Sequence, residues 1–192
     1  MMQKPVLFMV LIGCTPNGRH TEQHDVFFGI AENIKELVPA IIEFWPEAEG
    51  RMHIDAWREV THVDGYKISV AEKQNAAQDN KDDSALQKLF FLNLGGYKQN
   101  EFEEYHYKMI CVAPGKGVAV QQAKQTAFYK HTGFKGAESH IDDKYGVDVD
   151  DVYAIEDILP PGMKEKYSLL ITPAGKAAED TLNLGYFIFS KL

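Results

Sequence analysis

Two histidines and two carboxylates stand at spacings that could bring them together. Glu22 and His24 are two residues apart in the chain, and so are His53 and Asp55. Because residues two apart on a β-strand point to the same face of a sheet, each pair can converge on one side. Two imidazoles and two carboxylates suit a metal site of the histidine/carboxylate kind, or general acid–base catalysis.

The same two pairs recur later in the chain, as Glu104 with His106 and as His140 with Asp142. A duplicated protein seldom needs two copies of one active site, so the recurrence favours a structural role over catalysis. In that interpretation, a Glu–His or His–Asp hydrogen bond holds a turn or the start of a strand in each copy, and the polar groups satisfy one another. Ligand or metal binding and acid–base catalysis stay open as alternatives.

The turn over residues 13–22 is a second candidate, because part of it is not repeated in the second copy. Arg19 could hold a carboxylate or phosphate with two hydrogen bonds, and the Cys14 thiol beside Arg19 and His20 could be partly ionised. The matching positions 96, 101 and 102 hold Gly, Glu and Phe. A solvated hairpin loop is the structural alternative. The candidate ligand-binding residues are therefore Arg19, His20, Glu22, His24, His53 and Asp55.

These residues are set on a chain that carries an internal duplication. Residues 53–68 align without a gap on residues 140–155, with seven identical pairs. Residues 7–13 align on 89–95, and at the same offset residues 22–24 align on 104–106. Matching blocks in the same order make chance a poor explanation and indicate two copies of one structural unit.

Each copy shows the order β-β-α-β-β. Apolar runs and alternating segments predict strands in the first copy at 7–12, 26–31, 52–57 and 65–70. The corresponding strands of the second copy are predicted at 89–94, 108–113, 139–144 and 151–155. Asn33 is predicted to cap a helix that begins at Ile34, with a kink or restart at Pro39. A helix after Pro114 is expected to turn Val120, Ala123, Ala127 and Phe128 inward.

The elements predict an α+β fold made by internal duplication of the β-β-α-β-β unit. Its sheets should be mainly antiparallel, with one helix per unit and a pseudo-two-fold arrangement of the units. We expect a first unit over residues 1–71, a polar linker over 72–87, a second unit over 88–159 and a C-terminal extension with added strands over 160–192.

The composition excludes several classes of partner. Acidic residues outnumber basic ones 28 to 20, which gives a net charge of −8 and leaves no basic surface for nucleic acid. The apolar run at residues 5–14 is too short to span a bilayer, which needs about 20 residues, so no membrane partner is expected. Cys14 and Cys111 do not indicate a disulfide framework, and the cytoplasm is the expected location. A small-molecule ligand, or a homodimer formed through an exposed edge strand, is compatible with these features.

Several of these motifs together resemble the bacterial family catalogued as domain of unknown function 1543. They are Leu94-Gly95-Gly96-Tyr97 with Glu104-x-His106, Glu22-Gln23-His24-Asp25 with His53-Ile54-Asp55, and the run over residues 59–66. The resemblance spans roughly residues 6–70 and 89–159, and the first copy departs from it at Ile12-Gly13-Cys14. It implies a cytoplasmic protein with two copies of the unit, and it brings no activity, substrate or catalytic residue.

The leading hypothesis from the sequence is a non-catalytic protein that binds a small molecule or another protein. It rests on the duplicated scaffold and on the lack of a recognised catalytic motif. The alternative is a metal-dependent or acid–base enzyme that uses Glu22, His24, His53 and Asp55 in the first copy. The sequence names no cofactor.

Overall fold

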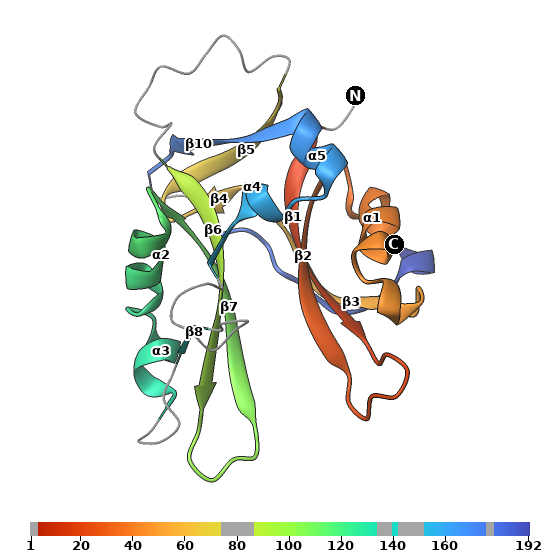
Figure 1. The fold of residues 1–192 in the computed structure, drawn as a ribbon. Helices are drawn as coiled ribbons and strands as arrows, with labels where there is room; N and C mark the ends of the chain where they lie inside the picture. Colours follow the sequence, from red (N-terminus) through yellow and green to blue (C-terminus); the bar gives the residue numbers. More distant parts are fainter. Residues whose placement is uncertain (1–3, 74–86, 134–139, 142–151, 176–178) are drawn as a thin grey trace. The chain divides into compact units, whose positions relative to one another are not determined.

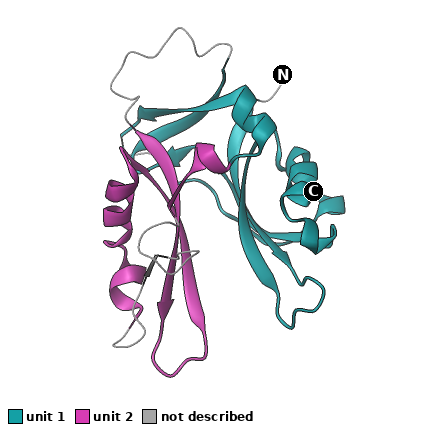
Figure 2. Ribbon diagram, viewed as in Figure 1, with its two compact units in different colours: residues 1–79, 159–192 teal, residues 80–158 magenta. Residues whose placement is uncertain are grey.

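The structure is a computed structural model that describes residues 4–73, 87–133, 140–141, 152–175 and 179–192. The chain divides into two compact units (Figure 2). Unit 1 comprises Met1–Asp79 with Leu159–Leu192, and unit 2 comprises Asn80–Ile158. The predicted linker 72–87 lies largely outside the described residues. The C-terminal extension belongs to unit 1.

Unit 1 is built on a four-stranded antiparallel sheet with the strand order β11-β3-β1-β2 (Figure 1). The strands are β1 (Val6–Cys14), β2 (Gln23–Ala31), β3 (His53–Val60) and β11 (Asn183–Ile188). β1 and β2 form the predicted hairpin. One face of β1, with Phe8, Val10, Ile12 and Cys14, is fully buried, whereas Met9 and Leu11 on the other face are half-buried. β11, from the C-terminal extension, adds the strand beyond β3.

A short helical segment covers one face of this sheet. It begins as the 3₁₀ helix η1 (Ile34–Leu37) and restarts as α1 (Val38–Phe44), which has a proline in its first turn. The Asn33 side chain accepts a hydrogen bond from the Glu36 backbone N–H, so the predicted cap is confirmed. Pro39 lacks a backbone donor, which the first turn of a helix does not need, and this explains the restart. A second 3₁₀ helix, η2 (Pro46–Ala48), leads on toward β3.

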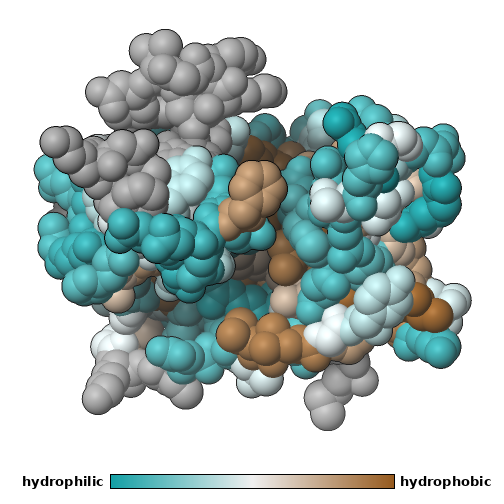
Figure 3. Space-filling view, turned by 90° about the horizontal axis from the view of Figure 1, so that it is seen from below, coloured by the Kyte–Doolittle hydropathy of each residue, from teal (hydrophilic) through white to brown (hydrophobic). Residues whose placement is uncertain are grey.

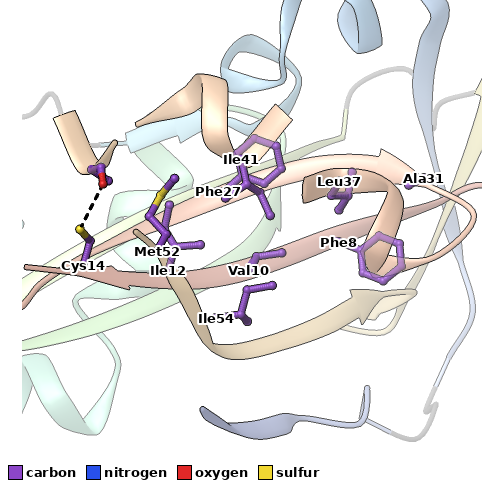
Figure 4. Packing of buried hydrophobic residues seen from close by; sticks show 11 residues of the cluster. Phe8, Val10, Ile12, Cys14, Phe27, Ala31, Leu37, Ile41, Met52 and Ile54 are labelled. Carbon is purple, nitrogen blue, oxygen red and sulfur yellow. Dashed lines mark hydrogen bonds between the residues drawn. The ribbon is translucent and has the colours of Figure 1, made fainter. Parts of the chain in front are cut away.

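The core of unit 1 lies between the sheet and this helical segment, as Figure 4 shows. Leu37 and Ile41 of the helical segment are completely buried. They belong to one cluster with Phe8, Val10, Ile12, Cys14, Phe27, Ala31, Ala48, Met52 and Ile54. Burial of each large apolar side chain stabilises the fold by about 1.5–3 kcal/mol, so this cluster fixes the central strands β1 and β3 with respect to each other.

The rest of unit 1 is a three-stranded antiparallel sheet with the order β10-β5-β4. Its strands are β4 (His62–Val63), β5 (Tyr66–Glu72) and β10 (Tyr167–Pro173), and α5 (Pro161–Lys166) leads into β10. β5 and β10 pair over seven residues. The C-terminal extension therefore contains added strands, as predicted: β10 pairs with β5 and β11 pairs with β3, both in unit 1.

Unit 2 has a main antiparallel sheet in which β6 (Lys88–Tyr97) pairs with β7 (Glu104–Ala113) on one side. On its other side β6 pairs with β8 (His140–Ile141) and β9 (Val152–Ala154). The helices are α2 (Lys116–Ala123), α3 (Ala127–His131) and α4 (Ile155–Ile158). Val120 and Ala123 face the core as predicted. Phe128 lies in a separate helix, because Thr126 accepts a hydrogen bond from the Tyr129 N–H and caps a new start.

The two hairpins repeat each other in register. Val6 pairs with Ala31 in the first hairpin, and Lys88 pairs with Ala113 in the second. Both residues of the second pair lie 82 positions after those of the first. The copies diverge after the His-Ile-Asp motif, although the sequences still align. Tyr66 lies in β5 of the small sheet of unit 1, whereas its sequence partner Tyr153 lies in β9 and pairs with β6. The α+β class and the antiparallel sheets are confirmed, and the pseudo-two-fold arrangement stays a prediction.

One face of the molecule carries both hydrophilic and apolar side chains. The face shown in Figure 3 is largely hydrophilic, with separate hydrophobic patches between hydrophilic side chains. Three of the most exposed apolar side chains, Leu182, Leu184 and Tyr186, lie on or next to β11. Within the described residues, no helix is both long enough and apolar enough to span a membrane. Formation of a homodimer stays a prediction.

Candidate functional site

A row across three strands of unit 1 places a glycine between two histidines. Gly13 of β1 pairs with His24 of β2 on one side and with His53 of β3 on the other. Directly opposed residues share a face, so both imidazoles project from the same side of the sheet. A Cβ atom on Gly13 would lie 2.5 Å from Asp55 Oδ2 and 2.7 Å from His53 Nε2, too close for any ordinary contact. The glycine therefore leaves the space in which these side chains meet.

A β-bulge brings Asp55 to the same face. The pairing of β3 with β1 passes from Ala56 opposite Leu11 to Ile54 opposite Ile12, so Asp55 is an extra residue on β3. A bulge bends the strand and re-aims the side chain of the extra residue. Glu22 directly precedes β2. The bulge and the glycine row together assemble Glu22, His24, His53 and Asp55, which we call the His/carboxylate cluster.

The cluster is a ring of four contacts. His53 Nε2 lies 3.1 Å from Asp55 Oδ1 and 3.2 Å from Glu22 Oε1. His24 Nε2 lies 3.3 Å from Asp55 Oδ2 and 3.6 Å from Glu22 Oε2. Each carboxylate thus turns one oxygen toward each histidine. In the described part of the chain, no group of three or more His, Cys, Asp or Glu side chains is arranged so that it could hold a metal ion as it stands. The ring is therefore not a coordination shell in its present geometry.

Two buried atoms of the cluster have no hydrogen-bond partner among the described residues. They are His53 Nε2 and Asp55 Oδ2. Each lies within ion-pair distance of a neighbour, but none of the contacts has the direction that a hydrogen bond requires. Buried polar atoms are nearly always hydrogen-bonded. The two atoms lie 2.7 and 2.5 Å from the position of a Cβ on Gly13, so they border the same space.

The cluster reaches from the protein interior to the solvent. The His53 side chain is only 6% exposed and that of Asp55 is 25% exposed, whereas those of His24 and Glu22 are 40% and 43% exposed. A small solute can therefore approach from the side of His24 and Glu22. His53 and Asp55 form the buried end of the site.

The hairpin turn does not join this cluster. Arg19 and His20 are exposed, and neither side chain has an ion pair or hydrogen bond with another described residue. The turn is instead held by Arg51, whose Nη2 donates to Asn17 Oδ1 at 3.0 Å. Sequence reasoning missed Arg51 because it lies more than thirty residues further along the chain.

Cys14 also differs from the expectation of a partly ionised thiol. Its side chain is buried in the core, and Sγ lies 4.0 Å from the carbonyl oxygen of Ala48 (Figure 4). Burial raises the pKa of this thiol, and the Arg51 guanidinium offsets the effect only in part. The thiol therefore stays protonated at neutral pH. Arg19 and His20, which are exposed, are not among the charges that shift this pKa.

Unit 2 repeats the row of a glycine between two histidines. Gly95 of β6 pairs with His106 of β7 and with His140 of β8. Glu104 accepts a hydrogen bond from the Tyr97 hydroxyl at 2.7 Å, and the first copy has a threonine at the position that matches Tyr97. Asp142 lies outside the described residues. Glu104 thus has a tyrosine hydroxyl as donor, whereas the neighbours of Glu22 in unit 1 are the two histidines.

A separate hollow of about 510 Å³ opens on unit 1. Asp180 anchors its wall, because Oδ2 accepts hydrogen bonds from the backbone N–H groups of Thr61 and His62 and Oδ1 accepts one from the Thr61 hydroxyl. The hollow is lined by Trp57, Glu59, Thr61, His62, Glu179, Asp180, Thr181 and Asn183. No sequence pattern singled out this hollow, since it forms between β3 and a segment from the far end of the chain.

Comparisons with known proteins bear on the family and on the fold. Residues 19–70 match the family model described as "Domain of Unknown Function (DUF1543)", so the resemblance seen in the sequence is confirmed over that part of unit 1. The match includes Glu22, His24, His53 and Asp55 and does not extend to unit 2. No curated protein matches the chain.

The fold has a counterpart among solved structures. The crystal structure of protein Il1583 from Idiomarina loihiensis superposes with a TM-score of 0.55 at 22% sequence identity. The match covers 96% of this chain and 97% of that one. At this identity the likeness concerns the fold alone.

Proposed function

We propose that unit 1 binds a divalent metal ion, with zinc as the preferred ion, in the His/carboxylate cluster. The observation that carries the proposal is the pair of buried atoms without a hydrogen-bond partner, His53 Nε2 and Asp55 Oδ2. Both can donate a lone pair to the same cation. Two imidazole nitrogens with two carboxylates form a ligand set that zinc accepts in tetrahedral geometry.

The cluster brings the four side chains close enough to share one small ion. Each histidine Nε2 lies 3.1–3.6 Å from one oxygen of each carboxylate. Two ligands at about 2.0–2.2 Å from a tetrahedral centre lie roughly 3.3–3.6 Å apart, so small shifts would bring both nitrogens and one oxygen of each carboxylate to such distances.

A modest rearrangement would convert the ring of contacts into a coordination shell. Each carboxylate divides its two oxygens between the histidines, so Glu22 must turn one oxygen toward the space above Gly13, which Asp55 Oδ2 already borders. Glu22 and His24 have the freedom to do so because both side chains are more than a third exposed. His53 and Asp55 would stay in place as the fixed half of the site, which keeps the cost of assembling the site low.

The structural interpretation of the same residues is less well supported. It expects a hydrogen bond within each Glu–His or His–Asp pair. None of the four nitrogen–oxygen contacts in unit 1 has hydrogen-bond geometry. A purely structural cluster would therefore leave buried polar atoms uncompensated, at a cost of about 1–3 kcal/mol for each atom.

The test is direct titration of the metal-free full-length chain. After removal of bound metal with a chelator, zinc should bind to unit 1 with one high-affinity site, measured by competition with a chromophoric chelator. Cobalt(II) added in place of zinc should give the visible bands of a tetrahedral N/O site. His53→Ala should weaken zinc binding by roughly 100-fold or more, because about 2.5 kcal/mol is associated with each ligand of a four-ligand site.

His20→Ala is the matched control, because it removes an exposed histidine from the same hairpin without touching the cluster. This variant should bind zinc as the unmodified protein does. Asp55→Asn, which keeps the shape of the side chain and removes its charge, should behave like His53→Ala. Equal zinc affinity in the unmodified chain, His53→Ala and Asp55→Asn would contradict the proposal, as would a complete lack of zinc and cobalt binding.

A further inference from the structure

Tyr186 of β11 packs directly on the buried histidine of the cluster. The centroid of its ring lies 4.0 Å from that of the His53 imidazole, and the two planes are 28° apart. Tyr186 itself is 71% exposed. One face of its ring therefore covers the imidazole while much of the side chain stays in solvent.

The backbone of β11 is irregular at the point where it carries this ring. The pairing with β3 passes from Leu184 opposite Ala56 to Phe187 opposite Ile54. Gly185 and Tyr186 thus stand opposite the single residue Asp55. Gly185 has a φ of +148°, a conformation that side chains with a Cβ rarely adopt. The pairing of β3 with β1 and the pairing of β3 with β11 are therefore both interrupted at Asp55. These two interruptions bring Asp55 and Tyr186 to the same imidazole, that of His53.

We infer that Tyr186 is a positioning residue for the proposed metal site and holds the plane of the His53 imidazole. This inference rests on the proposed function. A histidine donates to a metal through a lone pair that lies in the plane of its ring, so a rotation of the ring moves that lone pair off the metal. Groups that orient a ligand in this way change metal affinity by about 10- to 100-fold when they are removed.

The arrangement leaves the imidazole little freedom. The side chain of His53 is 6% exposed, and its Nε2 lies between Glu22 and Asp55. Tyr186 covers one ring face. Loss of the tyrosine ring would uncover that face to water and let the imidazole turn. The stacked ring should also slow release of the bound ion, because it closes one route between His53 and the solvent.

The test compares three variants of the full-length chain by zinc affinity and by the cobalt(II) spectrum. Tyr186→Ala should raise the zinc dissociation constant by about 10- to 100-fold and shift the cobalt bands, because the geometry at the metal changes. Tyr186→Phe keeps the stacked ring and should stay within about threefold of the unmodified chain. Leu184→Ala removes another highly exposed side chain from the same strand and should leave both measurements unchanged.

The outcomes separate this inference from the proposed function. If the unmodified chain binds zinc and Tyr186→Ala matches it in affinity and in the cobalt spectrum, the positioning role is wrong while the metal site stands. If Tyr186→Phe is as weak as Tyr186→Ala, stacking is not the cause and the inference is again overturned. A chain that binds neither zinc nor cobalt overturns the proposed function and this inference with it.

Discussion

Replacement of Gly13 by alanine is the sharpest test of how the cluster is built. The change adds one methyl group in the centre of the site. That atom would lie 2.5 Å from Asp55 Oδ2 and 2.7 Å from His53 Nε2. Ordinary contact begins at 3.4 Å, so the Asp55 oxygen must retreat by about 0.9 Å and the His53 nitrogen by about 0.7 Å.

Displacements of this size should abolish metal binding without unfolding the chain. Metal–ligand distances tolerate deviations of about 0.2 Å, which is well below the required shift. The atoms that must move are the ends of side chains, so they can shift while the chain stays folded. The free energy of unfolding should fall by about 1–3 kcal/mol. The loss of backbone freedom in the unfolded chain offsets about 0.5–1 kcal/mol of that cost.

The assay is the zinc-induced increase in melting temperature. At a zinc concentration 100 times the dissociation constant, binding stabilises the native state by about 2.7 kcal/mol. For a chain of this length that corresponds to roughly 5–11 °C. The unmodified chain should show this increase and Gly13→Ala should show less than about 1 °C. Gly117→Ala is the control, because nothing lies within 4 Å of the added atom, and it should keep the full increase.

The result that would refute the reasoning is simple to recognise. If Gly13→Ala kept a zinc-induced increase equal to that of the unmodified chain, the space above Gly13 would not be the metal site. The same conclusion would follow if Gly117→Ala lost the increase as well, since the effect would then not depend on the glycine row. A circular dichroism spectrum matching that of the unmodified chain establishes that Gly13→Ala is folded.

Four further predictions concern stability and reactivity. Asn33→Ala should destabilise unit 1 by about 1 kcal/mol, because it removes the cap of η1; urea denaturation checks this, and Asn33→Ser should retain most of the stability. Asp180→Ala should cost about 1–3 kcal/mol, since it leaves donors of Thr61 and His62 unpaired, whereas the neighbouring Glu179→Ala should cost almost nothing. In a Cys111→Ala background, Cys14 should react with a thiol reagent at pH 7.5 much more slowly than a free cysteine; an equal rate would show that the thiol is not protected. Burial raises the pKa of the Cys14 thiol in the folded state. The protonated thiol therefore contributes to the free energy of unfolding below the ordinary thiol pKa of about 8.5, and this contribution is lost as the pH rises through the folded pKa. The difference in unfolding free energy between the unmodified chain and Cys14→Ala should therefore shrink above about pH 8.5.

Much of the secondary structure could be predicted because it is coded locally. The apolar run of β1, the turn after it and the Asn33 cap each depend on neighbouring residues, and all three are confirmed. The second half of the repeat could not be predicted in the same way. Aligned residues such as Tyr66 and Tyr153 lie in different sheets, because the pairing partner of a strand is decided by long-range contacts that similar sequences can satisfy differently.

The candidate site shows the same division between local and long-range information. The sequence by itself determined the residue types and the two-residue spacings that let Glu22 with His24, and His53 with Asp55, share a face. Only the tertiary structure decided that the two pairs meet. It set both histidines beside Gly13, turned Asp55 inward at a bulge and placed Tyr186 from the far end of the chain on the imidazole. The physical reason is that strand register is set by the packing of the whole sheet, and a shift of one residue would send every one of these side chains to the opposite face.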